Sequence, residues 1–88
     1  MAAKEKETRT LEMIPTRAYR FINTWGKEEH EFFFKGSDGA LYITFTTSKS
    51  LIEKLAENIG KPIVATFDIA AHYNLDFDAY RIRGVKIA

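Results

Sequence analysis

Few side chains in this sequence have the types and spacing that catalysis requires. The chain has no cysteine, only two histidines, and neither a G-x-S-x-G nor a Walker lysine motif. His30 falls on the inward phase of a predicted strand, where a hydrogen-bonded core histidine is more common than a general base. His72 precedes Asp76 and Asp78, but their spacing is not that of an EF-hand and no second histidine accompanies them. We therefore expect no enzymatic activity, no cofactor and no metal site.

Aromatic and basic side chains offer a different chemistry. Aromatic residues make up 14% of the sequence, with seven Phe, four Tyr and one Trp. A ring that faces solvent can stack on a planar ligand, and a neighbouring cation can neutralise a phosphate. Strand alternation predicts that Phe33, Lys35 and Tyr42 point outward. The same alternation would also suit cross-strand aromatic packing that only stabilises a sheet.

The net charge of +1 hides an uneven distribution of charge along the sequence. Charged side chains are all basic within residues 13–27 and 79–88, whereas acidic residues gather at 28–31 and 68–78. A near-neutral total argues against a protein that coats duplex DNA or an anionic membrane. The two basic segments could still form a track for phosphates, or a solvated face with weak ion pairs. The acidic residues at 28–31 would repel a phosphate.

The pattern of apolar residues predicts a single, mainly β domain with one helix. Residues 1–12 are expected to form a flexible tail and residues 13–88 the domain. Ser50 and Glu53 form a capping box for a helix that ends before Gly60. The predicted strands cover residues 18–25, 29–35, 41–47, 63–70 and 79–87.

The same pattern assigns the side chains of the core. Gly84 interrupts the alternation of the last strand, and a bulge at this glycine restores it. The predicted apolar stripe of the helix consists of Ile52, Leu55, Ala56 and Ile59. The predicted inward side chains of the strands include Tyr19, Phe21, Phe32, Phe34, Leu41, Ile43, Phe45, Ile63, Ala65, Phe67 and Ile69.

The order of the elements, three strands, a helix and two strands, resembles that of the oligonucleotide/oligosaccharide-binding (OB) fold. That fold is a five-stranded Greek-key barrel, and its helix lies between the third and fourth strands. The resemblance covers Ala18 to Ala88 and concerns element order and spacing, without a diagnostic motif. A β-grasp-like α+β roll is the alternative, although it leaves either residues 18–25 or residues 41–47 without a role.

The resemblance implies where a ligand would bind. OB proteins usually bind ligands on the outer surface of the second and third strands, flanked here by loops 26–29 and 71–78. It also implies a single-stranded nucleic acid as ligand, DNA rather than RNA, with little sequence preference. A homo-oligomer is implied as well, because one short groove gains affinity from linked copies. The candidate binding residues are Arg20, Trp25, Lys27, Phe33, Lys35, Tyr42, Tyr73, Arg81 and Arg83.

Two alternatives stay open at this point. Trp25 shares its phase with Tyr19 and Phe21, so it is either a core residue or a residue at the rim of the groove. The aromatic face could instead bind another protein, which would make the chain an accessory or interaction module. The sequence contains no apolar segment that resembles a signal peptide or a membrane span, so we expect a cytoplasmic protein.

Overall fold

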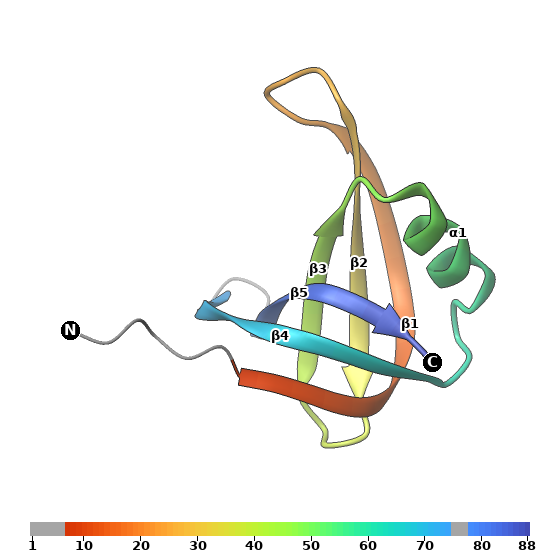
Figure 1. Ribbon diagram of the computed structural model, residues 1–88, viewed down its shortest axis with the longest axis vertical. Helices are drawn as coiled ribbons and strands as arrows, with labels where there is room; N and C mark the ends of the chain where they lie inside the picture. The colour runs from red at the N-terminus through yellow and green to blue at the C-terminus, as the bar shows by residue number, and fades with distance from the viewer. Residues whose placement is uncertain (1–6, 75–77) are drawn as a thin grey trace.

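The computed structural model describes residues 7–74 and 78–88, and for Glu7 and residues 70–74 it describes the backbone alone. These residues form a mainly β fold with one helix between the third and fourth strands, as the sequence predicts (Figure 1). The elements are β1 (Glu7–Ile22), β2 (Glu28–Gly36), β3 (Leu41–Thr46), α1 (Lys49–Glu57), β4 (Ile63–Asn74) and β5 (Ala79–Ile87).

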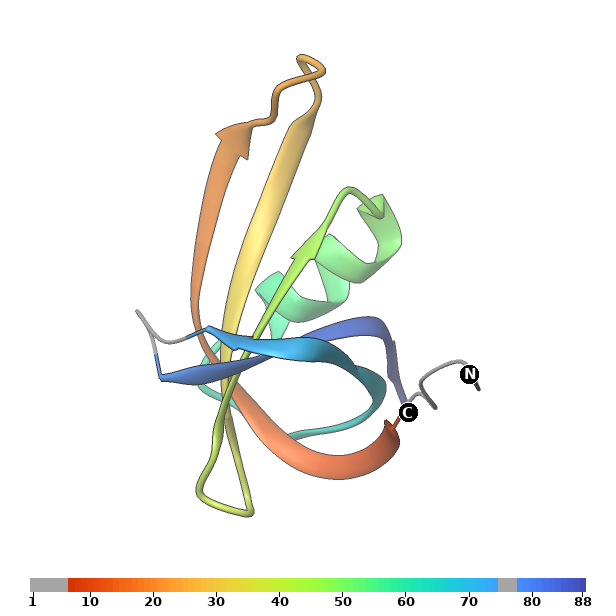
Figure 2. The ribbon, with the colours of Figure 1, turned by 90° about the vertical axis from the view of Figure 1, so that its left-hand side faces the viewer.

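The pairing of the strands closes into a ring. The order is β1-β2-β3-β5-β4, and β4 pairs back onto β1. Neighbouring strands are antiparallel except β3 and β5, which run parallel through Tyr42 and Ile43. β4 and β5 cross β2 and β3 steeply (Figure 1). The end of β1, the turn and the start of β2 form a hairpin arm, residues 19–31, whose base pairs with β3 through His30 and Glu31 and whose tip projects beyond the ring (Figure 2).

β1 belongs to two parts of the ring because it bends at Pro15 and Thr16. Residues 7–13 pair with β4, and pairing with β2 begins at Met13, which pairs with both strands. The register with β2 shifts between Pro15 and Arg17, which leaves Thr16 as a bulge. Pro15 has no N–H for the ladder, and its carbonyl accepts the N–H of Gly60 at 2.7 Å. The bulge therefore accommodates the proline and redirects the strand.

The start of β1 corrects the predicted tail. A tail over residues 1–12 is wrong for residues 7–12, which pair with β4 through the backbone. The hydroxyls of Thr10 and Thr66 also lie 2.9 Å apart across this pair of strands. The high charge of the segment suggested a solvated tail, but a strand at this position places Thr10 and Glu12 outward and packs Leu11 against the core.

Two strand ends also differ from the prediction. β1 ends at Ile22 rather than at Trp25, because the following residues form the turn of the arm. β4 continues to Asn74, so residues 71–74 belong to a strand and not to the predicted loop. The β1 side of the arm is therefore shorter, and β4 longer, than the apolar pattern indicated.

The core fills the inside of the ring and is closed by α1. The inward phases predicted for β2 and β4 are confirmed. Of the predicted helix stripe, Leu55 is fully buried and Ile52 packs against the core, whereas Ala56 and Ile59 are exposed. The inner core consists of Met13, Phe32, Phe34, Tyr42, Leu55, Ile63, Ala65, Phe67, Ile82 and Val85.

The two ends of α1 are fixed by local hydrogen bonds and backbone conformation. The N-cap is Ser48 rather than Ser50, because the Ser48 hydroxyl accepts the N–H of Leu51 at 3.5 Å. The helix therefore begins two residues earlier than predicted, at Lys49. The helix ends at Glu57 with Asn58 as its C-cap, so Gly60, with a φ of +81°, lies one residue beyond the C′ position predicted for it.

The predicted phase of β3 is wrong. Tyr42 and Thr44 point into the core and are buried, whereas Leu41 is exposed. Tyr42 can occupy the core because its hydroxyl donates to Asp38 at 2.5 Å and accepts from Nη1 of Arg9 at 3.1 Å. The hydroxyl therefore has both an acceptor and a donor as partners. A tyrosine can thus occupy a core position, which the apolar pattern had assigned to Leu41 and Ile43 instead.

The predicted bulge in β5 is confirmed. Thr66 pairs with Lys86 and Asp68 pairs with Arg83, so one residue of β4 lies opposite two residues of β5. Gly84 has a φ of +59°, a conformation that side chains with a Cβ branch strongly disfavour. The bulge returns Val85 to the core side of the strand after Ile82.

We expect Gly84→Val to lower the free energy of unfolding by about 1–2 kcal/mol, the cost of left-handed backbone for an ordinary residue. An added Cβ would meet nothing closer than Asp68 Oδ2 at 3.6 Å, so the cost is conformational and not a clash. Gly84→Asn is the matched control, because Asn tolerates this region better. Thermal unfolding should show the Val variant melting roughly 4–15 °C lower. Equal melting temperatures for wild type and the Val variant would contradict the bulge.

We expect Tyr42→Phe to destabilise the protein by about 1–2 kcal/mol through loss of the bond to Asp38. The Tyr42 hydroxyl holds the pKa of the Asp38 carboxyl below 3.8, with a smaller contribution from Arg9. A lowered pKa contributes stability above the unfolded-state value, and that stability is lost as pH falls through the folded-state value. The difference between wild type and variant should thus shrink in acid. Carboxyl NMR titration should show the pKa of Asp38 rising in Tyr42→Phe and unchanged in the exposed control Tyr19→Phe.

Candidate nucleic-acid interface

Four strands present a continuous set of side chains on the outside of the ring, which we call the outer face. Tyr19 on β1 is paired with Glu31 on β2, and Glu31 is paired with Phe45 on β3. Paired residues of neighbouring strands point to the same side of a sheet. The outer face consists of Arg17, Tyr19, Phe21, Glu29, Glu31, Phe33, Phe45 and Arg81.

The outer face has an apolar base of its own. Ile43 is paired with Phe33 on one side and with Arg81 on the other. It is fully buried, yet it lies outside the cluster of the inner core. Side chains of the outer face therefore cover Ile43, which fixes the positions of the rings around it.

The rings of the outer face form two edge-to-face pairs. The ring centroids of Tyr19 and Phe33 are 5.8 Å apart at 85°, and those of Phe21 and Phe45 are 6.1 Å apart at 86°. Tyr19 remains 48% exposed and Phe21 37% exposed. The pairs hold the rings in place and leave flat apolar surface open to solvent.

An arginine accompanies each ring pair. Cζ of Arg17 lies 5.6 Å from the ring centroid of Phe33, and Cζ of Arg81 lies 4.7 Å from that of Phe45. Both distances are within the range of cation–π attraction, about 6 Å. The two guanidinium groups come from β1 and β5, so positive charge borders the rings on both sides.

Glu31 lies among these rings. Its side chain is partly buried, and this burial raises the pKa of its carboxyl above 4.5, although the charge of Arg81 opposes the shift. A shallow pocket of about 230 Å³ lies beside it, lined by Arg17, Tyr19, Glu31 and Phe33. The pocket thus combines two rings, a cation and a carboxylate within one small volume.

Two residues predicted from the sequence lie where the prediction requires. Phe33 and Arg81 are both on the outer face, and each takes part in a ring–guanidinium contact. Lys35 is exposed further along the same side of β2. Arg83 is exposed on β5 and is paired in register with Asp68. These four positions remain candidates for ligand binding.

Other predicted site residues do not lie on the outer face. Tyr42 is fully buried, so its assignment as a stacking residue is wrong. Arg20 points to the opposite side of the arm, where its Nε lies 3.7 Å from Glu28. The backbone of Tyr73 pairs with Tyr80, but its side chain lies outside the described residues.

Trp25 and Lys27 lie in the turn at the tip of the arm. The side-chain oxygen of Asn23 accepts the N–H groups of both residues at 3.0 Å, and Gly26 has a φ of +75°. Trp25 is 83% exposed, so the alternative that placed it in the core is wrong. The alternation of β1 gave a wrong position for Trp25 because β1 ends at Ile22 and the turn that follows redirects the side chain.

Sequence reasoning missed three rings of the outer face, Tyr19, Phe21 and Phe45. Large aromatic side chains were assigned to the core, whereas this sheet has apolar side chains on both surfaces. Arg17 was missed because the first strand was predicted to begin at residue 18, and Glu31, which shares the outward phase of Phe33, was considered only as a source of repulsion. The useful signal was the outward phase of Phe33, since its partners across β1 and β3 must share it.

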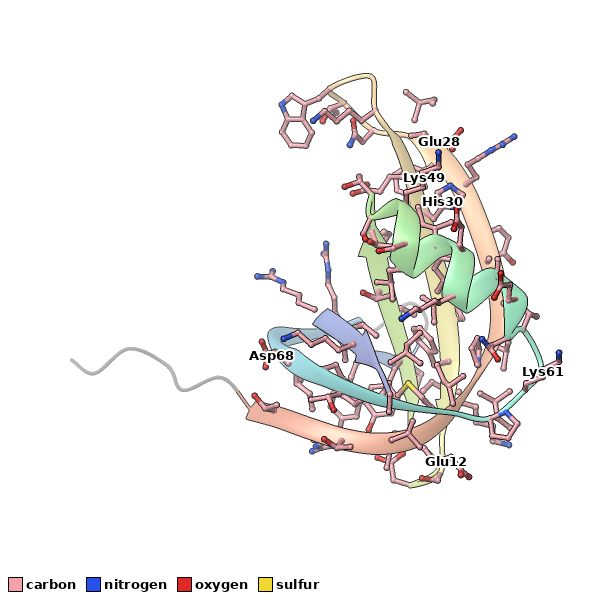
Figure 3. All side chains as sticks on the ribbon, turned by 45° about the vertical axis from the view of Figure 1, so that its right-hand side comes forward. Glu12, Glu28, His30, Lys49, Lys61 and Asp68 are labelled. Carbon is pink, nitrogen blue, oxygen red and sulfur yellow. The ribbon has the colours of Figure 1, made fainter. Side chains whose placement is uncertain are left out.

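Two further pockets border α1. One of about 510 Å³ lies between the end of β3, the start of α1 and β5, and includes Lys54 and Lys86. The other, about 410 Å³, lies between the arm and α1, where Glu28, His30 and Lys49 come together (Figure 3). Nε2 of His30 lies 3.2 Å from Glu28 on the inward side of β2. Among the described residues, no group of three or more His, Cys, Asp or Glu side chains could hold a metal ion.

Comparison with known proteins adds no relative. No family model matches the chain, and neither a curated protein nor a solved structure matches it. Within residues 7–74 and 78–88, no helix has the length and apolar character needed to cross a membrane. A functional argument therefore rests on the geometry of the chain itself.

We expect Glu31→Gln to stabilise the protein at neutral pH, because it removes a partly buried charge. The raised pKa of Glu31 means that the folded state binds this proton more tightly than the unfolded state. Wild type should therefore lose stability as pH rises from about 4.5 through the folded-state pKa. Urea titrations at several pH values should show the advantage of Glu31→Gln shrinking as pH falls through that range. Glu12→Gln, at an exposed position, controls for net charge. An advantage that is independent of pH would contradict this account of Glu31.

Proposed function

We propose that this protein is an OB-type module that binds single-stranded nucleic acid through the outer face. It would bind with little overall sequence preference, by base stacking and phosphate neutralisation, and DNA more readily than RNA, as the resemblance to OB proteins implied. The observation that carries the proposal is the pair of exposed ring clusters, each accompanied by an arginine. Sequence-tolerant binding of single strands requires this combination of stacking surface and cations.

The topology supports an OB-type barrel. β4, β1, β2 and β3 lie side by side in that order, and each is antiparallel to its neighbour. Three sequential strands with a fourth returning beside the first make a Greek key. β5 joins β3 to β4 and closes the ring, and α1 lies between β3 and β4 in the chain. A β-grasp-like roll would not use the first strand in this way.

The position of the rings supports the binding surface. OB proteins bind oligonucleotides on the face of the second and third strands. Phe33 and Phe45 are on that face of β2 and β3, and the arm extends it through Tyr19 and Phe21. Bases would stack on this surface while phosphates pass Arg17 and Arg81.

Acidic side chains limit where phosphates can run. Glu31 lies at the centre of the outer face, so phosphates must pass along its borders rather than over it. The exposed Lys35 and Arg83 extend the positive borders. Bases over the centre and phosphates at the edges are consistent with the net charge of only +1.

Docking of a protein is the second candidate function. Its support is the exposed apolar surface of the same outer face, where Tyr19 is 48% exposed and Phe21 37% exposed. A second copy of this chain is one partner of this kind, because linked copies would also lengthen a short nucleic-acid groove. Binding of oligonucleotides and self-association are therefore measured separately.

We expect wild type to bind a labelled oligothymidylate in a fluorescence anisotropy titration, more weakly as salt rises. Phe33→Leu keeps an apolar cover over Ile43 but removes a stacking ring. It should cost about 1–3 kcal/mol of binding, roughly a 5- to 150-fold loss of affinity. Arg20→Ala is the matched control, since Arg20 lies on the other side of the arm.

If wild-type protein at micromolar concentration does not bind the oligothymidylate at low salt, the nucleic-acid proposal is wrong. A flat titration together with self-association that Phe33→Leu abolishes, measured by analytical ultracentrifugation, would favour protein docking. Equal losses for Phe33→Leu and Arg20→Ala would contradict the assignment of the outer face.

A further inference from the structure

Glu31 is an unexpected residue at the centre of a surface that would meet a polyanion. It lies on β2 between Tyr19 of β1 and Phe45 of β3, in register with both. Within the described part of the chain, the carboxylate of Glu31 makes no hydrogen bond to the protein, its oxygens are not fully buried, and the charge of Arg81 is nearby. Partial burial removes part of the hydration of this carboxylate, which favours a hydrogen-bonded partner. A ligand that supplies N–H donors would satisfy it.

The pocket beside Glu31 limits the shape of such a ligand. Its volume is about 230 Å³ and its walls include the rings of Tyr19 and Phe33. These two rings are nearly perpendicular, at 85°, so a planar group can stack on one while the edge of the other borders it. Arg17 lines the same pocket and supplies donors to the acceptor edge of the ligand.

The bases differ in what they offer to a carboxylate. Guanine presents two adjacent donors, N1–H and N2–H, which match the two oxygens of one carboxylate. Its O6 and N7 are acceptors, and arginine is their usual partner in proteins. Thymine and uracil present one N–H between two carbonyl oxygens, and those oxygens would face the carboxylate. Cytosine and adenine offer one amino group next to an acceptor nitrogen.

We propose that the pocket between Tyr19 and Phe33 selects a guanine base, with Glu31 accepting its N1–H and N2–H and Arg17 facing its O6 and N7. The inference rests on the proposed function, because it names the base that one position of the bound strand prefers. The remaining bases would stack without selection. A single selective position explains why a carboxylate lies on a surface that otherwise suits any single strand.

The test compares short oligothymidylates that carry one central substitution, with wild-type protein and fluorescence anisotropy. A single guanine should raise the affinity roughly tenfold over thymine, the worth of a charge-assisted hydrogen bond. Hypoxanthine at the same position lacks the 2-amino group and should lose most of that gain. Adenine and cytosine should gain less than guanine.

Two variants test whether a preference for guanine arises from the pocket. Glu31→Gln should bring the ratio of guanine to thymine affinities close to one, because the amide cannot accept both N–H groups. Glu12→Gln, at an exposed position of β1 that pairs with Val64 of β4 outside the outer face, changes the net charge equally and should leave the ratio as in wild type. Melting temperatures of both variants establish that they fold.

The outcomes separate the two proposals. If oligothymidylate binds but guanine gives no gain, or if adenine and cytosine gain as much, the selection of guanine is overturned and the nucleic-acid function stands. A guanine gain that persists in Glu31→Gln also overturns the inference. If no oligonucleotide binds at low salt, both proposals fail together.

Discussion

The bend of β1 at Pro15 and Thr16 is the constraint on which the rest of this structure depends. β1 pairs with β4 through residues 7–13 and with β2 from Met13 onward, and the bulge that follows turns the strand from one partner to the other. The carbonyl of Pro15 also receives the N–H of Gly60, which ties the end of the helical connection to the bend. Closure of the ring follows from this bend, as does the direction in which the β1–β2 arm projects (Figure 2).

A second constraint is that the sheet is apolar on both surfaces. The inner surface packs around residues such as Phe34 and Phe67, while the outer surface covers Ile43 with rings and guanidinium groups. The rings of the outer face therefore stabilise the sheet and remain partly exposed at the same time. Their edge-to-face geometry holds them in place before any ligand arrives, which lowers the entropy lost on binding. Glu31 is the exception, because partial burial disfavours its charged carboxylate, and a hydrogen-bond donor from a ligand would reduce that cost.

The sequence predicts the order of the elements, the inward face of β2 and β4, and the bulge at Gly84, because each leaves a local signal. Alternation within one strand gives its faces, and a glycine that breaks alternation marks a bulge. The phase of β3 could not be predicted in this way. Both Tyr42 and Ile43 are buried, and the choice between them depends on Asp38 and on neighbouring strands. The sequence therefore predicts only part of the outer face, through Phe33.

The central claim is that the outer face binds single-stranded nucleic acid. The most direct measurement is a titration of ¹⁵N-labelled protein with a short oligothymidylate, followed by the chemical shifts of backbone amides. We predict that the largest changes fall on the central parts of β1, β2 and β3 and on Arg81 of β5, with little change along α1. An absence of changes, or changes confined to the pocket between α1 and β5, would contradict the claim.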